Sequence, residues 1–119
     1  MRAWIYSRIS EFTPVSRLDN KLEHLKQYAD MLSYEIVGIS SEITNQCPSN
    51  REAITRIRDL CKQNKIDLLL VDESMSLSNN KDTLKRIVNN LDNVGCCVLS
   101  STEGLLNHRV NYVYSPVLI

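Results

Sequence analysis

Blocks of apolar residues divide the chain into predicted strands and helices that follow one another in turn. Runs rich in aliphatic, β-branched or aromatic residues predict strands at residues 3–10, 34–39, 68–71 and 96–99. Between them, apolar residues recur at helical spacing, which predicts helices over about 16–31, over about 51–64 and from residue 82 onward. The third strand is apolar throughout, and this is typical of a strand that is covered on both faces.

The order β-α-β-α-β-α-β predicts an α/β fold. We expect a three-layer α/β/α architecture with a mostly parallel sheet of about four strands and right-handed crossovers. After the fourth strand, residues 100–107 predict a loop, and the alternation from Val110 to Tyr114 predicts a short edge strand that Pro116 ends. With 119 residues, the sequence fits a single domain over 1–119.

Composition narrows the functional classes. Fourteen basic residues balance fourteen acidic ones, so the formal net charge is zero, and this counts against strong autonomous binding to DNA. The sequence has no apolar run long enough to cross a bilayer and no signal-peptide pattern at its start, so we expect a cytoplasmic protein with no membrane partner. No Gly-rich phosphate loop is present, which counts against a nucleotide-binding domain.

The cysteines and acidic residues give no metal site. Cys47, Cys61, Cys96 and Cys97 fit no zinc spacing, so we expect structural roles for them in a reducing compartment. Two adjacent carboxylates, Asp72 and Glu73, lack further ligands nearby in the sequence. We therefore predict no metal and no small-molecule cofactor.

Candidate chemistry lies at the end of the first predicted strand. Arg8 and Ser10 are two residues apart, so both point to one face if the strand continues through Ser10. In an open α/β sheet, ligands bind at the carboxyl ends of the strands. A guanidinium beside a hydroxyl at that end suits a phosphate, because arginine matches phosphate oxygens with two donors. The competing interpretation is that the Ser10 hydroxyl only caps the turn from strand to loop.

The stretch from Tyr6 to Ser10 resembles the Tyr-x-Arg-x-Ser opening of the serine recombinases, the family of resolvases and DNA invertases. Further segments resemble that family in the same order, at residues 16–25, 34–38, 49–53, 65–71 and 101–104. The resemblance is strongest over 1–107 and implies a resolvase-like fold. It also implies that Ser10 attacks a DNA phosphodiester to form a phosphoserine, and that Arg8 and Arg51 are active-site arginines. Alternatively, these two arginines pair with Glu42 or Asp72.

The chain departs from the family pattern at the segment that reads Asp-Arg-Leu-x-Arg in the family. Here Met75 stands in place of the aspartate, and Ser76 and Asn79 stand in place of the two arginines that hold the phosphate. One lost arginine in a phosphoryl-transfer site costs on the order of a thousandfold in rate. Lys21, where the family usually has glutamine, restores charge but presents a point charge rather than a fork. Whether the chain is an enzyme is therefore left open.

The tail also differs from the family, in which a long dimer-forming helix leads to a DNA-binding domain. Residues 108–119 show strand-like alternation and a proline, so we expect a divergent tail with no DNA-binding domain. Three hypotheses remain: an active strand-exchange fragment that uses Ser10, a degenerate recombinase-like module, or an unrelated phosphate-binding or nucleotide-binding α/β domain. We favour the second, with weak DNA binding, a protein partner or a second copy of the chain as its partners.

Overall fold

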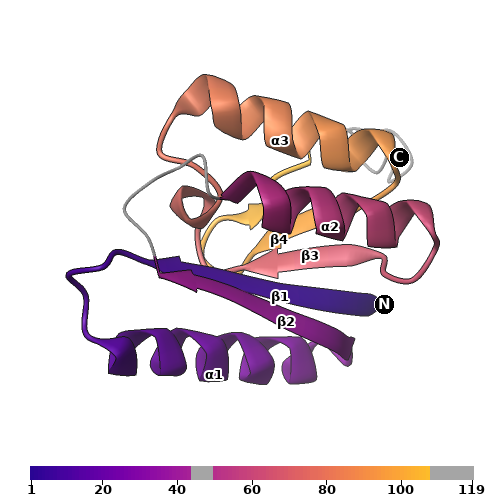
Figure 1. Cartoon of the computed structure of the whole chain (residues 1–119). Helices are drawn as coiled ribbons and strands as arrows, with labels where there is room; N and C mark the ends of the chain where they lie inside the picture. Colours follow the sequence, from indigo (N-terminus) through magenta and orange to yellow (C-terminus); the bar gives the residue numbers. More distant parts are fainter. Residues whose placement is uncertain (44–49, 108–119) are drawn as a thin grey trace.

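The computed structural model describes residues 1–43 and 50–107, apart from the side chains of Asn50 and Arg51. Its elements follow the predicted order of strands and helices (Figure 1). They are β1 (Arg2–Ile9), α1 (Val15–Met31), β2 (Glu35–Ile43), α2 (Asn50–Lys62), β3 (Leu68–Val71), the short 3-10 helix η2 (Ser74–Ser76), α3 (Lys81–Asn93), β4 (Cys97–Ser100) and β5 (Gly104–Leu105). The predicted strand over 110–114 lies outside the described residues.

The strands form one sheet in the order β2-β1-β3-β4-β5. Strands β1 to β4 are parallel and β5 pairs antiparallel with β4. Helix α1 covers one face of the sheet, and α2 and α3 cover the other (Figure 1). The predicted three-layer α/β fold with a mostly parallel sheet is therefore confirmed. The prediction of an uninterrupted loop over 100–107 is wrong, because Gly104 and Leu105 add a short fifth strand.

The core lies on both faces of the central strand β3, all four residues of which are buried. Leu68 and Leu70 face α1, whereas Leu69 and Val71 pack in the cluster under α2 and α3. This division follows from the two-residue period of a strand, which points successive side chains to opposite faces. The apolar run in the sequence is thus explained by two hydrophobic layers that share one strand.

Strand β2 lies at the edge of the sheet and is longer than predicted, because pairing with β1 continues through Ile43. The register shifts between Ala3 and Trp4, which places the Trp4 ring over Gly38. A side chain on residue 38 would overlap that ring, and the indole Nε1 donates a hydrogen bond to Ser40 Oγ at 2.8 Å. The glycine therefore leaves the space in which the Trp4 ring packs against β2.

The start of β1 is anchored to the turn before β3 by Arg2 and Asp67. The Arg2 backbone N–H donates to Asp67 Oδ2 at 2.9 Å, and its Nη2 donates to Oδ1 at 3.0 Å. These hydrogen bonds from Arg2 lower the pKa of Asp67 to about 2 from its ordinary value of 3.8. The pair thus stabilises the fold only while the carboxylate is charged.

We expect the Asp67→Asn variant to lose about 1 kcal/mol of unfolding free energy at pH 6, a small value because both side chains are more than one third exposed. Since the folded pKa is depressed, the advantage of the native chain is present above about pH 4. It is lost as the pH falls through the window from 3.8 to about 2. Urea unfolding of both proteins across this range measures the difference. Asp59→Asn on the exposed side of α2 is the control for a lost surface charge, and an Asp67→Asn deficit that persists unchanged at pH 2 would contradict the assignment.

Candidate functional site at the carboxyl ends of the strands

A pocket of about 420 Å³ opens beside the carboxyl end of β1. Its wall comes from the end of β1 and the loop after it, from the first half of α1 and from the segment around η2. The lining residues are Arg8, Ile9, Ser10, Thr13, Arg17, Lys21, Glu73, Met75, Ser76 and Asn79. The structure therefore brings Arg8 and Ser10 into one concave site at the edge of the sheet where ligands bind in open α/β folds.

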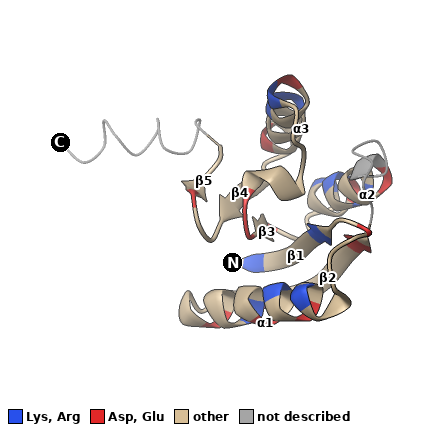
Figure 2. Cartoon of the chain, turned by 90° about the vertical axis from the view of Figure 1, so that its left-hand side faces the viewer, with Lys and Arg blue, Asp and Glu red and all other residues tan. Residues whose placement is uncertain are grey.

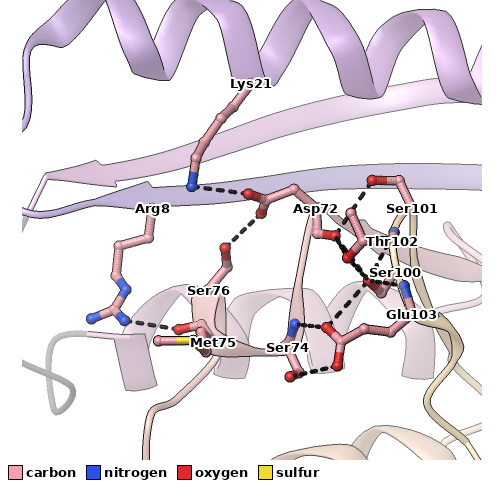
Figure 3. A network of polar contacts seen from close by, with 10 residues as sticks. All are labelled: Arg8, Lys21, Asp72, Ser74, Met75, Ser76, Ser100, Ser101, Thr102 and Glu103. Atoms are coloured by element: carbon pink, nitrogen blue, oxygen red, sulfur yellow. Dashed lines mark hydrogen bonds and ion pairs between the residues drawn. The ribbon is translucent and has the colours of Figure 1, made fainter.

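Arg8 extends from β1 toward η2 (Figure 3). Its Nη2 donates a hydrogen bond to the Met75 main-chain oxygen at 2.8 Å. Within the described residues it forms no ion pair with Glu42, which accepts from Tyr6 Oη at 2.8 Å, or with Asp72, which pairs with Lys21. Among the described residues, Arg8 thus pairs with neither of these carboxylates, and its hydrogen bond goes to a neutral carbonyl instead.

Ser10 follows β1 directly and begins the turn into α1. Its Oγ lies 2.8 Å from Thr13 Oγ1, and its main-chain oxygen accepts from the Thr13 N–H at 3.1 Å. The hydroxyl therefore supports the turn and at the same time lines the pocket. The side chain of Arg51 lies outside the described residues, and the catalytic roles of Ser10, Arg8 and Arg51 remain predictions.

Asp72, just after β3, is the centre of a polar network (Figure 3). Its Oδ2 lies 2.9 Å from Lys21 Nζ, and its Oδ1 accepts from Ser76 Oγ at 2.6 Å. Its main-chain oxygen accepts from the hydroxyls of Ser100 at 2.8 Å and Thr102 at 2.7 Å. Asp72 therefore links α1, the η2 segment and the loop after β4.

Glu103 fixes η2 from the other side. Its carboxylate accepts from the Ser74 backbone N–H at 2.5 Å and from Ser74 Oγ at 3.0 Å. Because the next residue, Met75, supplies the carbonyl that holds Arg8, Glu103 indirectly positions the pocket wall. Sequence reasoning missed this contact, which joins residues far apart in the chain.

The sequence also did not predict that Arg17 and Lys21 line the pocket together. They are one helical turn apart on α1, so their side chains share a face, and both line the pocket. Figure 2, which faces the carboxyl ends of the strands, shows basic positions on both α1 and β1. Among the described lining residues, three cations therefore face one carboxylate, Glu73, although the chain as a whole has no net charge.

The described cysteines suit structural roles rather than chemistry. Cys61 and Cys96 are free and buried, and burial raises the pKa of each thiol, which suits structural residues. Cys47 lies outside the described residues. Among the residues that the structure describes, His, Cys, Asp and Glu form no group suited to a metal ion. None of the described helices is both long and apolar enough to cross a membrane.

Comparison with known proteins shows which family the sequence matches. The family model described as "Resolvase, N terminal domain" matches residues 3–112, which extends beyond the span of 1–107 expected from the sequence. Comparison with curated protein sequences gives no significant match.

Solved structures similar to the chain are recombinase domains. The C-terminal catalytic domain of ISC1926 TnpA, an IS607-like serine recombinase, is 20% identical with a TM-score of 0.71, covering 84% of this chain and 67% of that one. The N-terminal catalytic domain of TP901-1 integrase is 17% identical with a TM-score of 0.73, covering 98% and 93%. A resolvase family site-specific recombinase from Streptococcus pneumoniae is 17% identical with a TM-score of 0.67, covering 96% and 85%.

Proposed function

Because the chain belongs to the resolvase N-terminal domain family, we propose that it binds a DNA phosphodiester in the pocket beside Ser10 but has lost most of the family's catalytic power. It then acts as a binding or regulatory module. The observation that carries this proposal is the unequal composition of the pocket wall. The side contributed by β1 keeps Arg8 and Ser10, whereas residues 75–79 contribute only neutral lining side chains.

The loss of catalysis follows from the demands of phosphoryl transfer, which depends on positioning and on stabilising the charge that develops on the phosphoryl oxygens. Ser76 is buried and its hydroxyl donates a hydrogen bond to Asp72, and Asn79 carries no charge. Neither offers the forked, charged donors of an arginine. The site therefore lacks stabilisation where the reaction needs it.

Binding requires fewer precisely placed groups than catalysis, because a cationic pocket attracts a phosphate whether or not the phosphodiester bond is cleaved. Membership in the family supports a DNA phosphodiester over a nucleotide as the ligand. An active recombinase remains the second candidate. It is favoured by one observation, that the Ser10 hydroxyl lies in the same pocket as three cations.

A fluorescent DNA duplex titrated at a series of salt concentrations tests the proposal. We expect weak, salt-sensitive binding, and we expect Arg8→Ala to weaken it by about tenfold, the effect of one charge-assisted hydrogen bond. Arg86→Ala on the exposed side of α3 removes the same charge away from the pocket and should bind like the native chain. Equal affinities of the two variants, or no binding by the native chain at low salt, would refute the proposal.

A further inference from the structure

We propose that Arg17 and Lys21 of α1 form a phosphate clamp across the pocket from Arg8, and that Lys21 exchanges its Asp72 partner for the bound phosphate. The choice of a phosphate as ligand rests on the proposed function. The clamp itself rests on the arrangement of these side chains. It goes further than the proposed function, because it assigns positive charge in the site to a helix in addition to Arg8 of β1.

The geometry of α1 places the two side chains together. Residues four apart lie on one face of a helix about one turn from each other, and both of these side chains line the same pocket as Arg8 and Ser10. Their origin on a regular helix fixes their spacing more firmly than a loop would. A phosphate in the pocket is therefore approached by cations from α1 and from β1.

Arg17 is available for such a ligand. Its side chain is exposed at the pocket rim, and within the described part of the chain it forms no ion pair. The guanidinium matches two phosphate oxygens at once, and it is more weakly hydrated than an ammonium group, so less hydration is lost when it binds a phosphate. Arg17 thus supplies the forked donor that residues 75–79 do not.

Lys21 already holds an oxyanion. Its Nζ lies 2.9 Å from Asp72 Oδ2, and its side chain remains 29% exposed. A carboxylate oxygen and a phosphate oxygen accept hydrogen bonds from an ammonium group in the same way. Asp72 therefore occupies the position at Lys21 that a phosphate oxygen takes when the ligand binds.

Asp72 can release Lys21 without losing its own place. Its second carboxylate oxygen keeps the hydrogen bond from Ser76, and its main-chain oxygen stays fixed by Ser100 and Thr102. The exchange consequently moves only the long lysine side chain. Glu73, the carboxylate that lines the pocket, opposes the incoming charge, and together with Asp72 it keeps the affinity low.

Matched glutamine variants test the clamp when their binding to the fluorescent DNA duplex is measured. We expect Arg17→Gln and Lys21→Gln each to weaken binding by about tenfold. Each should also reduce the steepness with which the logarithm of the binding constant falls with the logarithm of the salt concentration, by about 0.9. Lys26→Gln, an exposed position of α1 outside the pocket lining, should change neither value. Asp72→Asn keeps an acceptor for Ser76 but removes the charge that competes for Lys21, so it should tighten binding severalfold. Urea unfolding of each variant confirms that it is folded.

Inorganic pyrophosphate, titrated into the isotope-labelled chain and followed by NMR, separates the two proposals. If Arg17→Gln and Lys21→Gln bind duplex like Lys26→Gln while Arg8→Ala is weakened, the clamp is wrong and the proposed function stands. If the native chain ignores duplex but binds pyrophosphate through Arg17 and Lys21, the clamp stands and the proposed function fails. If it binds neither, both are wrong. Unchanged or weaker duplex binding by Asp72→Asn would overturn the exchange of partners at Lys21.

Discussion

Replacement of Leu70 by alanine is expected to lower the free energy of unfolding by about 2–5 kcal/mol, the usual cost of a cavity at a fully buried leucine. Leu70 is 0% exposed on the central strand β3, where it pairs with Ile5 of β1 and Leu99 of β4. Its side chain packs in the cluster that holds α1 against the sheet. Because neighbours on two adjacent strands and on a helix enclose it, the site cannot collapse to fill the void.

Ile39→Ala is the matched control, since it also truncates an aliphatic side chain of the sheet. Ile39 lies on the edge strand β2 and remains 40% exposed, so its truncation should cost about 1 kcal/mol or less. Urea unfolding measures both values, with the same dependence of unfolding free energy on urea concentration applied to both variants. Similar losses of unfolding free energy in the two variants would show that the cluster around Leu70 does not hold α1 against the sheet.

The burial and the length of each strand decided how well the sequence predicted it. The strand from Leu68 to Val71 was predicted correctly, because a run buried on both faces is apolar at every position. The extension of β2 to Ile43 was not predicted, since an exposed edge strand has little apolar alternation to show. Strand β5 has two residues, too few for any period to be visible.

The site was predictable only where it follows from strand geometry. Arg8 and Ser10 were correctly placed at the carboxyl end of β1, but the strand ends at Ile9, so the prediction that it continues through Ser10 is wrong and Ser10 begins the turn. Arg17 looked like any residue on the solvated face of a helix, and nothing local distinguishes a charge at a pocket rim from one in water. The contact between Glu103 and Ser74 joins the turn after β4 to η2, so it depends on the folded arrangement.

Restoring the family's segment, by Met75→Asp, Ser76→Arg and Asn79→Arg together, is expected to raise the yield of phosphoserine-linked DNA by about a thousandfold or more over the native chain. Met75 is 55% exposed and Asn79 is exposed, so position 75 accepts a charged carboxylate and position 79 a longer side chain at the pocket wall. Arg8 keeps its partner, because it binds the main-chain oxygen of residue 75 rather than a side chain. The two new guanidinium groups supply the forked donors that stabilise charge on the transferred phosphoryl group.

The change at position 76 is tested apart from the change at position 79, because Ser76 is 3% exposed and hydrogen-bonded to Asp72. An arginine at position 76 pairs with Asp72 in competition with Lys21, so Asn79→Arg alone measures what one exposed guanidinium contributes without that rearrangement.

Each protein is incubated with supercoiled plasmid and short duplexes, followed by denaturing gels and mass spectrometry for DNA attached to Ser10. Adding Ser10→Ala to the triple variant must abolish the product. An adduct formed by the native chain and lost in its own Ser10→Ala variant would show instead that the cations already in the pocket suffice for cleavage.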